Sequence, residues 1–89
     1  MKAIEEMREA RRRIRDRAAL HARLARRLQA DANKAKEKHF QKLYGAAAKD
    51  HHAKYIGLRW ASSSLSHAMR RAEEYERKAD LLTTLRAMG

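Results

Sequence analysis

The sequence predicts an all-α protein, and three observations support this. Proline is absent and glycine occurs only three times, so the residues that most often interrupt helices are nearly missing. Alanine, arginine, leucine, lysine and glutamate dominate, and all five favour helix. Valine is absent and isoleucine occurs only at positions 4, 14 and 56, so strand patterns are lacking. With 89 residues, we expect a single helical domain over residues 1–89.

The first helix is predicted over about residues 3–43. Small and apolar side chains recur there at helical spacing, so they share one face. The members of this stripe are Ile4, Met7, Ala10, Ile14, Ala18, His21, Ala25, Leu28, Ala32, Ala35, His39 and Leu43. Gly45 follows directly after Tyr44, and glycine readily adopts the left-handed conformation that closes a helix. We therefore place the turn at Gly45.

The second helix is predicted over about residues 47–87. Its stripe is a more regular heptad pattern of Leu58, Ala61, Leu65, Ala68, Ala72, Tyr75, Ala79 and Leu82. Asp50 suits an N-cap, although the alanines at 46–48 favour an earlier start. Small hydroxyls in mid-helix, at Ser62–Ser64 and Ser66, are typical of close helix approach. Gly57 weakens this helix and is the one candidate position for a break.

Two helices of similar length joined by a short connection predict an antiparallel hairpin. Folding at Gly45 would bring Ile14 beside Tyr75. It would also bring His21 beside His67. The acidic residues between 73 and 80 would then lie beside the arginines between 11 and 17, so the charge pattern agrees with the apolar pattern.

A lone hairpin buries one seam, and much of this seam is alanine. At about 25 cal/mol per Å² of buried apolar area, such a seam hardly offsets about 1.5 kcal/mol of ordering entropy per residue. We therefore expect two hairpins to associate as a homodimer in a four-helix bundle. The alternative is a three-helix bundle with a break near Gly57.

Enzyme chemistry has no support in the sequence. There is no cysteine, no glycine-rich phosphate loop and no nucleophile motif, so we expect no catalytic residue and no cofactor. The five histidines include no pair at the spacing of metal ligands on one helix, so no metal site is expected. No apolar run approaches the roughly 20 residues that span a bilayer, and no secretory signal is visible. We expect a cytoplasmic protein that does not act on membranes.

The strongest functional feature is a block of arginines in the first helix. The formal net charge is +11, and residues 11–29 hold eight arginines and one acidic residue, Asp16. The four acidic residues between 73 and 80 are too few to neutralise them. Guanidinium groups form paired hydrogen bonds to phosphate. The leading hypothesis is therefore binding to nucleic acid or a nucleoprotein, with phosphate contacts from Arg11, Arg12, Arg15, Arg23 and Arg27.

A second cluster lies close to the predicted turn. Tyr55 and Trp60 are flanked by Lys54 and Arg59. Aromatic rings among cations stack on unpaired bases, but an apolar centre with a cationic rim is also typical of protein interfaces. The alternative hypothesis is therefore an inhibitor or regulator, of the phage or mobile-element type. Such a protein would bind an acidic surface of a host protein through its basic face and through this cluster.

Overall fold

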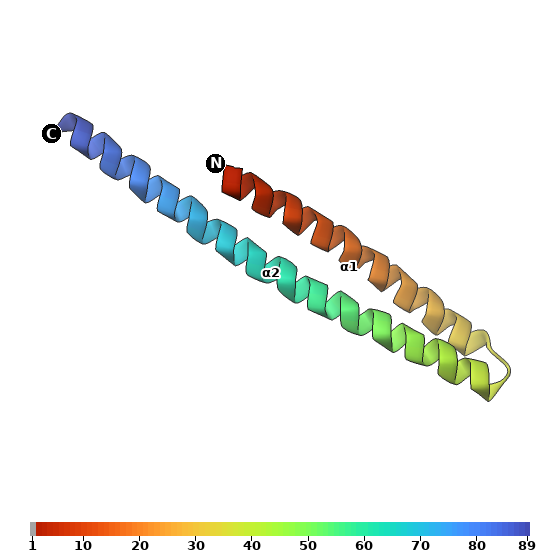
Figure 1. Cartoon of the computed structure of the whole chain (residues 1–89). Coiled ribbons are helices and arrows are strands. Elements are labelled where there is room, and N and C mark those ends of the chain that lie inside the picture. Colours follow the sequence, from red (N-terminus) through yellow and green to blue (C-terminus); the bar gives the residue numbers. More distant parts are fainter. Residues whose placement is uncertain (1) are drawn as a thin grey trace.

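The computed structural model describes residues 2–89 as two antiparallel helices (Figure 1). They are α1 (Lys2–Lys34) and α2 (Lys38–Met88), and the described residues include no strand. The molecule is a rod with extents of 78, 14 and 12 Å. The prediction of an all-α helical hairpin is confirmed.

The turn lies at residues 35–37, so the prediction of a turn at Gly45 is wrong. The amide of Ala35 closes α1 by donating to the carbonyl oxygens of Asp31 and Ala32, at 3.0 and 3.3 Å. Glu37 is extended, and α2 begins after it. Residues 33–39 contain no large apolar side chain, so a turn there costs the seam only Ala35 and His39 of the predicted stripe. Gly45 lies within α2, and its φ is not positive.

Helix α2 runs without a break through Gly57, so the three-helix alternative is also wrong. A glycine within a helix costs about 1 kcal/mol relative to alanine. A break would cost more, because Tyr55 and Leu58 on either side of Gly57 are both half-buried. Continuous packing therefore outweighs the local preference of one residue.

The seam between the helices follows the predicted stripe in α1 as far as Ala32. Its buried residues there are Ile4, Ala18, Ala25 and Ala32. Of the predicted stripe in α2, Leu58, Leu65, Ala68 and Ala72 are half-buried. The fully buried residues of α2 are instead Ala48, Ser62 and Met69, whereas Ala61, Tyr75, Ala79 and Leu82 are exposed.

The error in α2 has a physical cause. Two heptad stripes pass through Leu58, Leu65 and Ala72. One of them also contains Ala61 and Ala68, and the other contains Ser62 and Met69, each one residue further along the chain. The stripe with Ala61 is the more apolar, but the stripe with Ser62 is the one that faces α1. Moving the turn also changes the partners across the seam: His21 contacts His51, not His67, and Tyr75 is 73% exposed, not paired with Ile14.

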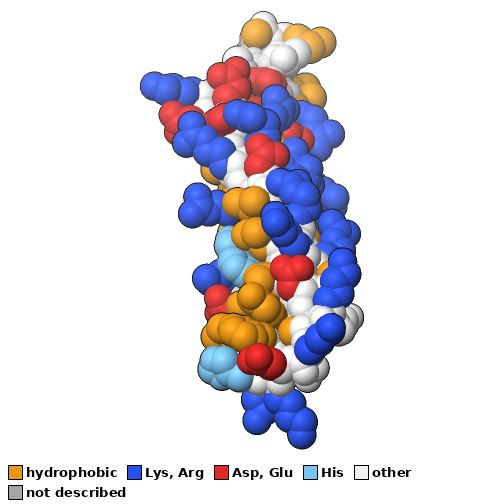
Figure 2. Space-filling model, turned by 90° about the vertical axis from the view of Figure 1, so that its right-hand side faces the viewer, with side chains coloured by type: hydrophobic (Ala, Val, Ile, Leu, Met, Phe, Trp, Pro, Cys, Tyr) orange, Lys and Arg blue, Asp and Glu red, His pale blue; other side chains and the backbone are white. Residues whose placement is uncertain are grey.

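The two helices differ in length by more than four turns, since α1 has 33 residues and α2 has 51. The C-terminal end of α2 therefore extends beyond α1 (Figure 1). We call residues 77–88 the projecting segment, and every residue in it is exposed. Figure 2 shows hydrophobic side chains at this end of the molecule, at the top of the view. The exposed apolar residues of the segment include Leu81, Leu82, Leu85 and Met88.

Candidate nucleic-acid interface

One side of the hairpin carries a groove between α1 and α2 whose lining includes seven arginines. It consists of two adjoining hollows of about 710 and 370 Å³, which share Arg15, Ser66 and Arg70. We call it the basic groove. Its arginines are Arg8, Arg11, Arg15, Arg23 and Arg26 from α1 and Arg59 and Arg70 from α2. Glu73 is the one carboxylate in its lining, and it forms an ion pair with Arg8 at 3.6 Å.

Serine hydroxyls on α2 hold two of these arginines across the seam. Arg15 donates from Nε to Oγ of Ser62 at 3.2 Å, and Arg11 donates from Nη1 to Oγ of Ser66 at 3.1 Å. Ser62 is buried, as expected for a small residue at a close helix approach. A guanidinium has five N–H donors, so one such contact positions the group and leaves other donors for an oxyanion.

The basic groove brings together five of the nine residues that the sequence pointed to. These are Arg11, Arg15, Arg23, Tyr55 and Arg59. It also includes Arg8, Arg26 and Arg70, which are not among those nine. The signal was present, because Arg15 and Arg26 are eleven residues apart, as are Arg59 and Arg70. Eleven residues are about three helical turns, so each pair shares one face of its helix.

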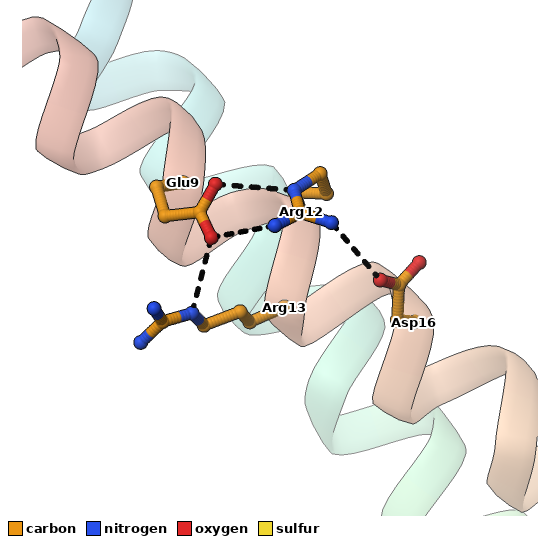
Figure 3. Close-up of polar contacts among 4 residues, drawn as sticks. All are labelled: Glu9, Arg12, Arg13 and Asp16. Atoms are coloured by element: carbon orange, nitrogen blue, oxygen red, sulfur yellow. Dashed lines mark hydrogen bonds and ion pairs between the residues drawn. The ribbon is translucent and has the colours of Figure 1, made fainter.

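Arg12 lies outside the basic groove and is engaged within α1 (Figure 3). It donates to both carboxylate oxygens of Glu9, at 2.6 and 3.1 Å, and lies 3.9 Å from Asp16. Arg13 donates to the same Glu9 at 3.2 Å. The hydrogen bond from Arg12 lowers the pKa of Glu9, and the carboxylate in turn raises the pKa of Arg12. These two arginines therefore balance acidic residues of their own helix. Arg27 does not line the groove either.

Trp60 lies at the rim of the basic groove, on α2. It is 72% exposed, and the small hollow beside it, of about 280 Å³, is lined by Ile56, Arg59, Trp60 and Ser63. Arg59 and Ser63 also line the basic groove, so the two hollows adjoin.

Tyr55 and Lys54 are adjacent in sequence but have different surroundings. Tyr55 is half-buried, and Arg59 donates to its hydroxyl at 3.3 Å while lying 5.8 Å from the ring centre. Lys54 does not line the groove and forms an ion pair with Asp50 at 3.0 Å. The hydrogen bond from Lys54 lowers the pKa of Asp50.

Two histidines meet across the seam between α1 and α2. The Nδ1 atoms of His21 and His51 are 2.8 Å apart, and the rings stack with centroids 5.1 Å apart. Burial lowers the pKa of His21, and the positive charges of His51, Lys54 and Arg17 lower it further. Among residues 2–89, no three potential metal ligands come together. The pair is therefore a polar contact within the seam.

No known family model matches the chain, and neither a curated protein nor a solved structure is similar to it. Within residues 2–89, neither helix contains a stretch that is long and apolar enough to cross a membrane. The most distinctive feature of the described surface is the basic groove, with its seven arginines.

Proposed function

We propose that this protein is a non-enzymatic binding protein that holds nucleic acid, free or within a nucleoprotein, by phosphate contacts in the basic groove. One observation carries the proposal: seven arginines from two helices converge on one groove whose lining contains a single carboxylate. Figure 2 shows many Lys and Arg side chains along the face in view. A cytoplasmic location is part of the same proposal.

The length of the groove favours a polymeric anion over a single phosphate. Arg8 and Arg26 mark its ends on α1, and eighteen residues of helix span about 27 Å. Guanidinium groups placed along such a distance match a chain of regularly spaced phosphates. The proposal therefore implies contact chiefly with the backbone of the nucleic acid.

The test is the salt dependence of binding. We expect the affinity for a fluorescently labelled oligonucleotide, measured by anisotropy, to fall by about 0.7 to 0.9 log units per tenfold increase in salt for each phosphate contact. Arg15→Gln, Arg23→Gln and Arg70→Gln should each weaken binding and flatten this slope by about one contact. The matched controls are Arg12→Gln and Arg13→Gln, which remove the same charge outside the groove. Binding that ignores salt, or equal effects at all five positions, would contradict the proposal.

We further propose that two hairpins form a four-helix-bundle homodimer through the side opposite the basic groove. On α2, Ala61 and Ala68 precede Ser62 and Met69 by one residue, which places them about 100° away from the seam on the side opposite Arg59 and Arg70. Leu20 is 44% exposed on α1. Small side chains let helices approach closely, and this arrangement would keep both grooves open.

The oligomeric state tests this second proposal. Ala61 is exposed in a single hairpin, so Ala61→Glu should leave the monomer folded but separate a dimer. Ala53→Glu, at another exposed alanine of α2, serves as the control. Sedimentation should show the wild-type protein and the control as dimers and Ala61→Glu as a monomer. A wild-type monomer at all concentrations would refute the bundle.

The alternative function is regulation of a host protein, and the apolar surface at Trp60 and Ile56 favours it. These side chains are 72% and 40% exposed and adjoin Arg59. A protein partner with an acidic rim would cover them. Such binding would depend less on salt than binding to nucleic acid, and Trp60→Ala would weaken it more than any single arginine substitution in the groove.

A further inference from the structure

We infer that the nucleic acid is single-stranded, with its backbone in the basic groove and an unpaired base stacked on Trp60. This inference rests on the proposed function and specifies the kind of ligand. Proteins that bind single strands without sequence preference combine a positively charged groove with aromatic side chains on which bases stack. The structure places both features side by side on α2.

The position of Trp60 supports stacking. Its ring is 72% exposed, and Arg59 and Ser63 connect its hollow to the basic groove. A backbone held by Arg59 would therefore carry its base toward the indole face. Each stacked base adds to the affinity without hydrogen bonds to the base, so no sequence preference is needed.

The shape of the site favours a single strand over a duplex. Duplex DNA is generally read by a helix that enters its major groove, with the cations on the convex side of that helix. In this protein the arginines line a hollow between two helices, which a single backbone can occupy. The bases of a duplex are stacked on each other, so their faces are not available to Trp60.

The hollow beside Trp60 is small, at about 280 Å³, and Ile56, Arg59 and Ser63 line it with the indole. Stacking needs no deep pocket, because a planar base requires only the exposed face of the ring.

The experiment compares oligothymidylate of about 20 nucleotides with a mixed-sequence duplex of the same length, using the full chain. Trp60 is the only tryptophan, so its fluorescence reports on the site directly. We expect the single strand to quench this emission and to bind more tightly than the duplex. Trp60→Ala should lower the affinity for the single strand about tenfold and leave the salt slope unchanged. Trp60→Phe should retain most of the affinity.

The matched control is Tyr75→Ala, because Tyr75 is 73% exposed on the same helix but lines neither the basic groove nor the hollow beside Trp60. It should change the affinity less than twofold. Circular dichroism should show the same helix content in all three variants.

Two results separate this inference from the proposed function. In the first, the arginine substitutions in the groove weaken binding, but the single strand does not quench the emission of Trp60 and Trp60→Ala binds normally. This result overturns the inference and leaves Trp60 to a protein partner, while the proposed function stands. If neither oligonucleotide binds with a salt dependence, both fail.

Discussion

The two parts of α2 show how little the apolar content of a helix says about its burial. Residues 38–76 run beside α1 and bury Ala48, Ser62 and Met69. The projecting segment, residues 77–88, contains three leucines and a methionine, and all four are more than half exposed. Ala48 and Ser62 are less apolar than leucine but are buried because they face α1, whereas the projecting segment lies beyond the N-terminal end of α1.

The difference teaches that helix formation and stability have separate sources in this chain. Nucleating a helix is costly, whereas extending an existing one adds a hydrogen bond for each residue ordered. The projecting segment is helical because it continues a helix that is already formed. We therefore expect nearly all of the free energy of folding to come from the paired part, and four predictions test this.

The largest effect is expected from a charge in the seam. Met69 is 4% exposed, so Met69→Asp would bury an unpaired carboxylate and should lower the free energy of unfolding by about 3 kcal/mol or more. Leu81→Asp, in the projecting segment at 59% exposure, should change it by no more than about 0.5 kcal/mol. Urea denaturation followed by circular dichroism measures both. Similar losses at the two positions would show that a partner covers the projecting segment.

A smaller effect is expected from overpacking. Ala25 is buried where the helices are close, so Ala25→Leu should force them apart and cost about 1 to 3 kcal/mol. Ala87→Leu makes the same chemical change in the exposed projecting segment and should be nearly neutral, because both residues favour helix. Thermal melts of the two variants measure the difference. An unchanged melting temperature for Ala25→Leu would mean that the seam is looser than the structure shows.

The third prediction is a pH dependence of stability that arises from His21 in the paired part. The pKa of His21 is lower in the folded protein than its ordinary value of 6.5, because of burial and the neighbouring charge of His51. The unfolded chain therefore binds a proton at His21 at a higher pH than the folded chain does. The contribution of His21 to stability is complete above pH 6.5 and is lost as the pH falls from 6.5 toward the lower pKa of the folded state. The melting temperature should therefore fall on acidification from neutral pH.

His21→Gln should flatten that pH dependence between neutral pH and about pH 5, and His52→Gln, at an exposed position, should not. The lowered pKa values of Glu9 and Asp50 add a separate loss of stability at more acidic pH, below their ordinary values of 4.5 and 3.8. A melting temperature that is constant down to pH 5 would show that the histidine pair contributes nothing.

The smallest effect is expected from removing the projecting segment. A chain that ends at Glu76 retains every fully buried residue, so its melting temperature should stay within about 3 °C of the full-length value. In the full chain, backbone amides of residues 77–88 should exchange with solvent faster than those of the paired part. A large loss of stability on truncation would contradict the distinction between the two parts.

The candidate site was predictable in part. The sequence identified the arginine block, and five of its nine nominated residues line the groove. It misplaced Arg12, because Glu9 is three residues away on the same helix and takes up its donors. It missed Arg70, although the eleven-residue spacing places Arg70 on the same face of α2 as Arg59; the pairing of the helices then brings that face beside Arg15. A list of charges along a chain does not say which of them are already balanced.

The sequence by itself determined that the chain is helical, that α1 packs through the stripe from Ile4 to Ala32, and that its charge is strongly positive. These properties depend on local preference and composition, which each segment carries alone. Only the tertiary structure decided the turn at 35–37, the rotation that buries Ser62 and Met69, and the length of α2 that α1 leaves uncovered. All three follow from how the two helices pair. Packing against α1 buries the stripe of Ser62 and Met69, although the stripe of Ala61 is the more apolar.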